Sequence, residues 1–480
     1  MKHTARKAVA GLMGGAMLLS LCAGCGTETK QTADPVDITI WTYYNGNQLE
    51  SFNAMVQEFN NTVGKEKGII VSVSSQGNVN DLETNVLNAA NGKVGSDPMP
   101  NIFSAYADTA YTMDKMGLAV DLSEYLTEEE KAAYVDSYLT EGDFDSSGSI
   151  KIFPVAKSTE LLFLNETDWQ AFAQATGASY EDLSTIEGLV RTAESYYNWT
   201  DAQTETPNDG KAFFGRDAMA NYMLAGAREL GCTIFDVGSD GKMTLYFDKD
   251  AVRTLWDNYY VPYVKGYFSA AGHFRSDDIK TGNILCYVGS NSSGTFFPKQ
   301  VMTSDTESHD IAMTVLPCPS FAGADPVSVQ QGAGMVVTKG DENQVKASLE
   351  FLKWFTAPEH NIAFSVGSAY LPVTKAANNM TAIRNSDVEL TPEMDQILTA
   401  ATDAVNHNGL YTTMPFAQGQ AARKVLEYAL SDLATADRDT VEARLAQGQT
   451  MTEAAGEFLT DAYFDAWYQE TLATLETMEG

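Results

Sequence analysis

The chain has 480 residues, of which 44% are hydrophobic, and its formal net charge is −33. Its length allows two domains, since a single hydrophobic core rarely grows past about 250–300 residues. The acidic excess excludes a nucleic-acid-binding protein, which needs clustered Lys and Arg, and it excludes electrostatic attachment to anionic lipid. We therefore expect no nucleic-acid partner.

The start of the chain has the pattern of a bacterial secretion signal. Three basic residues lie among the first seven, and residues 8–23 are uncharged and largely apolar. That run is too short to span a bilayer comfortably, which takes roughly 20 residues. Cys25 follows Ala-Gly and resembles the lipidated cysteine of a lipobox, although Cys22 replaces the more usual Leu. We expect a lipoprotein signal peptide at 1–24 and lipidation of Cys25, with a plain secreted protein as the alternative.

The elements that follow predict an α/β fold. Residues 25–36 are short and polar, as a tether would be. Apolar spacing then predicts strands at 37–41, 68–73 and 101–104, with helices at 49–59 and 82–90 between them. This order implies a parallel sheet with helices on its faces, and it places the ligand site in the loops that follow the strands.

Two acidic, glycine-containing segments are predicted to be hairpin turns. Asp143–Gly148 superficially resembles a calcium loop, but Pro154 stands where an EF-hand needs its bidentate Glu. Asp236–Gly241 precedes an alternating run and has the same character. From Thr391 onward the pattern is mainly helical.

No motif for catalysis or metal binding is present in the sequence. The five histidines are scattered, and no His-Glu-x-x-His, Cys-x-x-Cys or Gly-x-Ser-x-Gly occurs. The cysteines beyond Cys25 are too few for a disulfide framework; they are Cys232, Cys286 and Cys318. We expect no catalytic residue, no metal and no cofactor. A surface glycosidase remains an alternative, because the 64 acidic residues offer many carboxylate pairs.

Four segments in order carry a resemblance to a known family. They are Gly148–Asn165, Gly282–Gly294, Gly332–Pro358 and Ala369–Ala377, the last containing Tyr-Leu-Pro. With them, residues 38–447 resemble the family 1 extracellular solute-binding proteins of ABC importers, most of all the glycerol-3-phosphate-binding type.

The resemblance implies a two-lobe periplasmic-binding-protein fold of type II, like maltose-binding protein. The lobes would close about a hinge onto an interlobe ligand cleft. Carried over, lobe one would comprise 37–153 plus 327–371, and lobe two would comprise 154–326 plus 372–480.

Aromatic residues lie where the cleft should open. Tyr43, Tyr44 and Tyr106 directly follow predicted strands. Their rings can stack on sugar rings or glycerol carbons while the hydroxyl groups hydrogen-bond. Core packing is the alternative for each.

Small and polar residues form two further candidate segments. Ser292, Ser293 and Gly294 precede an apolar stretch and predict a helix N-terminus, whose N–H groups favour anions or polar oxygens. A simple helix cap is the alternative. Gly332 and Gly334 would let the backbone approach a ligand closely.

The remaining candidates come from family positions or from charge. Ser158, Thr159 and Tyr370 match family contact positions, and Tyr370 has core packing as its alternative. Arg216 and Arg423 are candidate cations for a phosphate, with a surface salt bridge as the alternative for Arg216.

The chain departs from the glycerol-phosphate type at two places. Ala107 replaces the acidic neighbour of the site tyrosine, and Gly419–Ala422 replaces the arginine-bearing stretch. A neutral sugar, an oligosaccharide or another phospho-compound therefore fits as well as glycerol-3-phosphate.

Together these observations predict a lipid-anchored substrate-binding subunit on the extracytoplasmic face of the cell membrane. It would act as a monomer, bind a sugar or glycerol-phosphate-like solute, and deliver it to ABC permease subunits. A ligand-sensing lipoprotein without a transporter is the other alternative.

Overall fold

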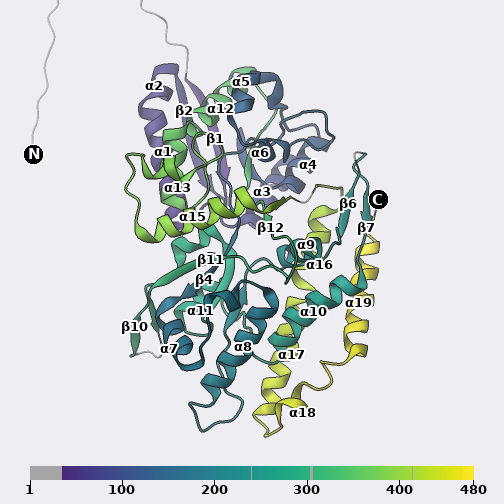
Figure 1. The fold of residues 1–480 in the computed structure, drawn as a ribbon. Helices are drawn as coiled ribbons and strands as arrows, with labels where there is room; N and C mark the ends of the chain where they lie inside the picture. The colour runs from purple at the N-terminus through teal and green to yellow at the C-terminus, as the bar shows by residue number, and fades with distance from the viewer. Residues whose placement is uncertain (1–34, 239, 303–305, 413, 480) are drawn as a thin grey trace, which may run out of the picture.

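The structure is a computed structural model that describes residues 35–238, 240–302, 306–412 and 414–479. The predicted signal peptide, Cys25 and nearly all of the predicted tether lie outside these residues. Two α/β bodies lie one above the other, each built on its own sheet (Figure 1). We call the body around the first sheet lobe one and the body around the second sheet lobe two.

The first sheet has the strand order β13-β3-β1-β2. β1 pairs with β2 and β3 in parallel, and β13 adds antiparallel to β3. The three strands β1, β2 and β3 and their parallel pairing were predicted from the sequence, and the prediction is confirmed. The strands are β1 (Val36–Thr42), β2 (Ile69–Ser75), β3 (Ile102–Ala105) and β13 (Gly334–Val337).

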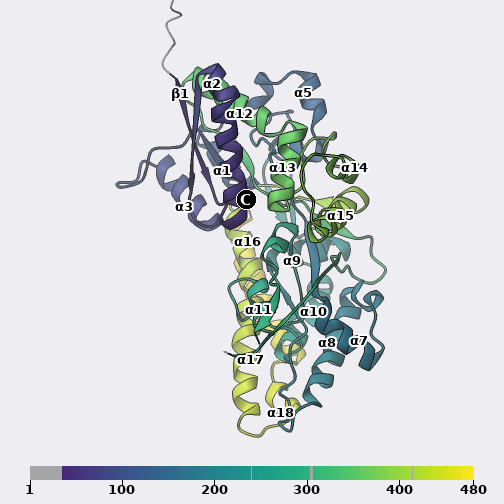
Figure 2. The same ribbon diagram turned by 90° about the vertical axis from the view of Figure 1, so that its left-hand side faces the viewer.

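Helices cover both faces of this sheet and bury a core rich in phenylalanine. The apolar spacing that predicted the first helix buries Phe52, Val56 and Phe59 on one face of α1. Figure 2 shows α1, α12 and α13 beside one another. The helical segments of lobe one are α1 (Gly46–Asn61), α2 (Val63–Lys67), α3 (Val79–Ala90), α4 (Ala107–Lys115), η1 (Leu122–Tyr125), α5 (Glu128–Ala133), α6 (Asp136–Thr140), α12 (Glu342–Phe355) and α13 (Pro358–Ser368).

The second sheet has the order β11-β4-β8-β5. β4 pairs antiparallel with both neighbours, and β5 pairs parallel with β8. All six residues of β4 are buried, so helices and loops cover it on both faces. The strands are β4 (Glu160–Asn165), β5 (Phe214–Arg216), β8 (Cys286–Ser290) and β11 (Met313–Pro317).

Lobe two is the more helical body, and the helical prediction beyond Thr391 is confirmed. Its last helices pack along α10, as the yellow ribbon in Figure 1 shows. The helical segments are α7 (Glu166–Thr176), η2 (Tyr180–Leu183), α8 (Ile186–Asp201), α9 (Met219–Glu229), α10 (Lys249–Val264), α11 (Arg275–Lys280), η3 (Asn291–Phe296), α14 (Met380–Arg384), α15 (Pro392–His407), α16 (Gly419–Tyr428), α17 (Ser431–Leu445), α18 (Met451–Ala455) and α19 (Asp461–Glu476).

Three two-stranded ladders complete the fold. They are β6 (Phe235–Val237) with β7 (Met243–Leu245), β9 (Gln300–Met302) with β10 (Ser308–Asp310), and β12 (Val327–Val329) with β14 (Gly409–Tyr411). The β6–β7 ladder confirms the predicted hairpin at Asp236–Gly241. The hairpin predicted at Asp143–Gly148 is wrong: no ladder flanks it in the described chain. Asp143 accepts the N–H groups of Ser147 and Gly148, each at 2.9 Å, and holds a loop instead.

The carboxyl end of the chain is tied to this hairpin. Glu479 accepts the N–H of Leu245 at 2.8 Å, and the Tyr468 hydroxyl on α19 donates to Phe247 O at 2.6 Å. The last helix and the β6–β7 hairpin therefore form one structural unit on the side of lobe two.

Candidate functional site

Three of the predicted tyrosines meet where the two lobes join. Tyr43 follows β1, and its ring stacks on Tyr106 with ring centroids 6.4 Å apart. Its hydroxyl hydrogen-bonds with that of Tyr370 at 3.2 Å and accepts the Ala333 N–H at 3.4 Å. Ser292 of lobe two also hydrogen-bonds with Tyr370. The structure thus brings these four predicted residues together, and we call Tyr43, Tyr106, Tyr370 and Ser292 the tyrosine cluster.

Burial keeps the phenol groups of the tyrosine cluster protonated. It raises the pKa of Tyr43, Tyr106 and Tyr370 above the ordinary value for tyrosine. The phenols are therefore neutral near pH 7 and offer hydroxyl groups and ring faces, which is the chemistry that a polyhydroxylated ligand uses.

Other predicted residues lie in packing positions. Tyr44 is buried in lobe one against Phe52 and Phe364. The expected helix N-terminus at Ser292–Gly294 is the short 3-10 segment η3, where the Ser293 hydroxyl donates to Ser290 O at 2.7 Å. A β-carbon on Gly294 would lie 2.6 Å from Ile397 and 2.8 Å from Phe163, so side-chain packing alone requires glycine there.

Local backbone and packing also explain the glycines at positions 332 and 334. Gly332 has a φ of +88°, which favours glycine, and its carbonyl accepts from Lys157 Nζ at 2.9 Å. A β-carbon on Gly334 would collide with the Ile152 side chain and would lie 2.9 Å from Phe153 O.

Replacing Gly334 by alanine is expected to destabilise the protein by about 1–3 kcal/mol, because a methyl group would be forced into a packed strand contact. Urea denaturation measures the change. The matched control is Gly340→Ala, where a β-carbon would meet nothing within 4 Å. An equal response of both variants would contradict the packing argument.

Three segments cross between the lobes side by side. Lys157 N donates to Leu371 O at 3.0 Å, and Ser158 N donates to Gln331 O at 2.9 Å. Ser158 and Thr159 are buried in this strip, and Thr159 N donates to Asn291 Oδ1 at 2.8 Å. The backbone of the predicted contact residue Ser158 thus holds two crossing segments together, and the backbone of Thr159 ties its segment to Asn291 of η3 in lobe two.

A buried ion pair stands at the same crossing. Lys157 pairs with Glu141, and the side chains are only 1% and 4% exposed. Glu141 also accepts from Gln330 Nε2 at 3.0 Å. The pair therefore links lobe one to two of the crossing segments.

The two predicted arginines belong to one polar network in lobe two. Arg423 on α16 donates to Asn221 Oδ1 at 2.6 Å, and Asn221 Nδ2 donates to Glu160 Oε1 at 2.9 Å. Arg216 pairs with the same Glu160, and its guanidinium lies 5.4 Å from the centre of the Tyr222 ring. Both arginines are therefore engaged by side chains of the protein itself.

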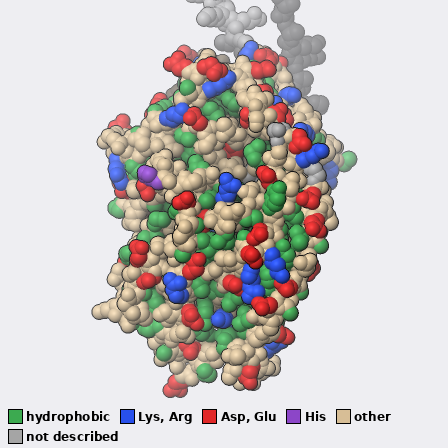
Figure 3. Space-filling model, turned by 45° about the vertical axis from the view of Figure 1, so that its right-hand side comes forward, with side chains coloured by type: hydrophobic (Ala, Val, Ile, Leu, Met, Phe, Trp, Pro, Cys, Tyr) green, Lys and Arg blue, Asp and Glu red, His purple; other side chains and the backbone are tan. Residues whose placement is uncertain are grey.

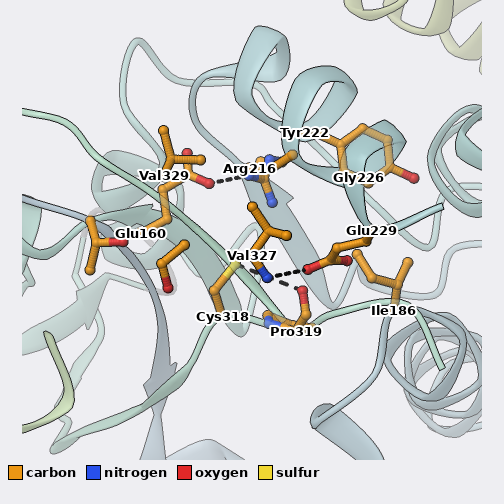
Figure 4. Close-up of a pocket in the computed structure, with 13 residues that line it drawn as sticks. Glu160, Ile186, Arg216, Tyr222, Gly226, Glu229, Cys318, Pro319, Val327 and Val329 are labelled. Atoms are coloured by element: carbon orange, nitrogen blue, oxygen red, sulfur yellow. Dashed lines mark hydrogen bonds and ion pairs between the residues drawn. The ribbon is translucent and has the colours of Figure 1, made fainter. Parts of the chain in front are cut away.

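Arg216 also borders a small cavity of about 20 Å³ beside β12 (Figure 4). Arg216 Nε and Thr159 Oγ1 have no hydrogen-bond partner among the described residues. Glu229 also lines the cavity and accepts the Val327 N–H at 3.0 Å. The volume suits one water molecule.

The lobes touch directly through α3 and α4 above and α16 below. Gln420 Nε2 donates to Glu83, which also accepts from Thr109 Oγ1 at 3.1 Å. The backbone of Gly419 lies so close to Asp108 that a β-carbon would collide with its carboxylate. Lobe one thus supplies two carboxylates to a contact in which lobe two supplies amide and cationic groups.

This contact shifts the pKa of both carboxylates. Burial raises the pKa of Asp108 to about 6, with Glu83 adding to the rise and Arg423 opposing it. Burial also raises the pKa of Glu83, against hydrogen bonds from Thr109 and Gln420. The joined lobes therefore bind protons more tightly than separated lobes would, because separation returns both groups to water.

Lowering the pH from 7.5 to 5 is expected to favour the joined lobes by about tenfold, since Asp108 becomes protonated in the joined form and stays ionised in the separated one. Fluorescence energy transfer between dyes on the two lobes measures this. Asp108→Asn should remove most of the dependence. A pH response that is identical in this variant would contradict the assignment.

Sequence reasoning missed Glu160, Asn221, Asp108 and Gln420. Glu160 directly follows the predicted Ser158 and Thr159. Asp108 lies one residue beyond Ala107, the position at which the resemblance implied an acidic residue. A search one residue to either side of the family position could have found it, whereas Asn221 gives no such signal.

Comparison with family models identifies the class of protein. Residues 54–395 match the family described as bacterial extracellular solute-binding protein. The chain belongs to this family, and the predicted resemblance is confirmed. Its members are extracytoplasmic solute-binding proteins rather than enzymes.

Comparison with solved structures confirms the maltose-binding-protein-like fold. UgpB from Mycobacterium tuberculosis with glycerophosphocholine matches with a TM-score of 0.65 and 18% identity, over 93% of this chain and 99% of that one. The substrate-binding protein Lmo0181 from Listeria monocytogenes with cycloalternan gives 0.65 and 16%, over 92% and 100%. The GacH receptor of Streptomyces glaucescens, solved with acarbose, gives 0.64 and 15%, over 89% and 97%. A search of curated proteins gave no match.

The described residues contain no cluster of His, Cys, Asp and Glu that could hold a metal ion, and no helix among them is long and apolar enough to cross a membrane. Cys232, Cys286 and Cys318 are free thiols in the structure.

Proposed function

We propose that this protein is the substrate-binding subunit of an ABC importer and that it captures a sugar or oligosaccharide between its lobes. The observation that carries the proposal is the tyrosine cluster, in which Tyr43 and Tyr106 of lobe one face Tyr370 and, across the junction, Ser292. Aromatic faces and neutral hydroxyl groups suit a carbohydrate, and hinge closure would enclose it.

A neutral ligand is favoured over a phosphate ester. Arg216 pairs with Glu160, and Arg423 donates to Asn221 and faces Asp108. A phosphate would have to displace these partners. The neighbours solved with acarbose and cycloalternan support sugars, and the neighbour solved with glycerophosphocholine supports glycerophosphodiesters as the second candidate.

A thermal-shift screen of sugars, sugar phosphates and glycerophosphodiesters tests the proposal. A ligand present at a hundred times its dissociation constant stabilises the folded state by about 2.7 kcal/mol, which raises the melting temperature measurably. Stabilisation by an oligosaccharide without hydrolysis supports a binding protein. Turnover of a glycoside that one carboxylate substitution abolishes would overturn it.

The boundaries of the two lobes are part of the proposal. We assign 37–153 plus 327–371 to lobe one and 154–326 plus 372–480 to lobe two, with the hinge at the crossing segments around Ser158 and Gln331.

Acidic side chains, with some Lys and Arg between them, are spread over the face in Figure 3, as suits a monomer kept soluble by its charge.

We further propose that Cys25 anchors the protein to the membrane. Cys25→Ala is expected to abolish incorporation of radiolabelled palmitate, because Cys25 is the cysteine that the predicted lipobox presents for acylation, and to release the protein or leave it unprocessed. Cys22→Ala is the matched control and should keep the label. Label retained in the Cys25 variant would contradict the assignment.

A further inference from the structure

A second pocket lies at the far end of α4 from the tyrosine cluster. Its volume is about 310 Å³, and both lobes line it. Lobe one supplies the last turn of α4 and two loops, and lobe two supplies the tip of the β6–β7 hairpin. The residues are Tyr111, Asp114, Lys115, Asp121, Phe144, Asp145, Ser147, Ser149, Lys151, Asp240 and Gly241. We call it the α4–hairpin pocket.

The lobe-one wall of this pocket is held in place by its own contacts. Lys151 Nζ lies 3.3 Å from Asp114 and 3.8 Å from Asp121. Asp121 in turn accepts the Ile150 N–H at 3.0 Å. The Asp143–Gly148 loop, which the sequence presented as a turn, forms the rim, and Asp143 fixes its backbone. The wall is therefore preformed before any ligand arrives.

The lobe-two side closes over this wall. The hairpin turn is tight, with Gly238 N donating to Lys242 O at 2.9 Å. Gly241 has a φ of +79°, and a β-carbon there would lie 3.1 Å from the Tyr111 hydroxyl. The hairpin tip therefore lies directly against Tyr111 of α4, where a larger residue than glycine would be crowded, and the pocket is complete only while the lobes are joined.

The lining suits a hydroxyl-rich ligand. Its four aspartate carboxylates oppose an anion, and two of them, Asp114 and Asp121, already have Lys151 as a cationic partner. Both donors and acceptors are present, with the hydroxyl groups of Ser147 and Ser149 among them. Tyr111 and Phe144, whose rings pack against each other in a T-shaped contact, add an aromatic surface. Hydroxyl groups that both donate and accept satisfy such a mixed lining.

We propose that the α4–hairpin pocket binds a sugar unit and thereby stabilises the joined lobes. The inference rests on the proposed function. The unit has two possible sources. It is either the far end of an oligosaccharide that also contacts the tyrosine cluster, or a separate monosaccharide. From Tyr106 to Lys115 the helix rises about 14 Å, a span that only an extended ligand would bridge.

Glucose and maltotriose are the probes, tested by saturation-transfer NMR and by crystals of the full mature protein soaked with each sugar. Ser147→Trp fills the pocket from an exposed rim position, and Ser74→Trp on β2 is the matched control in the same lobe. We expect Ser147→Trp to weaken binding of the sugar that occupies the pocket at least tenfold and Ser74→Trp to leave it unchanged.

Each outcome decides the inference. Glucose density in the pocket that persists in Tyr106→Ala indicates a separate monosaccharide site. Continuous maltotriose density from Tyr106 to the pocket indicates one extended ligand. A pocket that holds only water with both sugars, or binding that Ser147→Trp leaves unchanged, overturns the inference. Sugar bound at the tyrosine cluster alone would overturn it while leaving the proposed function intact.

Discussion

Replacing Tyr106 by alanine is expected to weaken binding of the solute found by the ligand screen at least tenfold, with little loss of stability. Tyr106 is half-buried at the N-terminus of α4 and stacks on Tyr43, so its ring lies at the edge of the core of lobe one rather than inside it. Removing such a ring at the centre of a site typically costs more than about 1.4 kcal/mol, which is tenfold in affinity. Isothermal titration calorimetry measures the loss.

Two comparisons make this test specific. Tyr44→Ala should lower stability strongly, because Tyr44 packs against Phe52 and Phe364 in the core. Tyr246→Ala, at an exposed position near the hairpin, should change neither affinity nor stability. If Tyr106→Ala lost its fold and its affinity together, Tyr106 would be a structural residue and the site would lie elsewhere.

Replacing Lys157 by methionine is expected to destabilise the protein by about 3–5 kcal/mol, the largest effect that we predict on stability. The substitution leaves Glu141 as a buried charge without its partner, and such a charge cannot recover its hydration. The double variant Lys157→Met with Glu141→Gln should recover most of the loss, because no unpaired charge remains. Urea denaturation followed by fluorescence measures both.

An exposed ion pair supplies the control for this prediction. Lys67 pairs with Glu350 on the surface of lobe one, and both side chains are at least one-third exposed. Lys67→Met should cost less than about 1 kcal/mol. If Lys157→Met cost no more than Lys67→Met, the crossing segments would not depend on the buried pair.

The sequence predicted the fold well because its signals are local. Alternating and helical spacing is visible within a few residues, and it located the three parallel strands of lobe one. The ordered family segments supplied the second lobe. The loop at Asp143–Gly148 shows the limit of this reasoning, because a turn sequence does not reveal whether strands pair on either side of it.

The site was predicted less completely because its contacts join distant parts of the chain. Tyr43 and Tyr370 are 327 positions apart, yet each stood beside a recognisable strand or motif. No recognisable strand or motif predicted two other contacts, the ion pair of Glu141 with Lys157 and the hydrogen bond of Arg423 to Asn221. Gly294 and Gly334 were read as ligand contacts, whereas neighbouring side chains and backbone already require glycine at both positions.

The tie between the carboxyl end and the β6–β7 hairpin has a practical consequence for anyone handling this protein. A bulky fusion partner placed directly after Glu479 would pull on the segment that holds Leu245, and so on the hairpin whose tip reaches lobe one. The same linkage makes a small fluorophore at the carboxyl end a convenient reporter of solute capture.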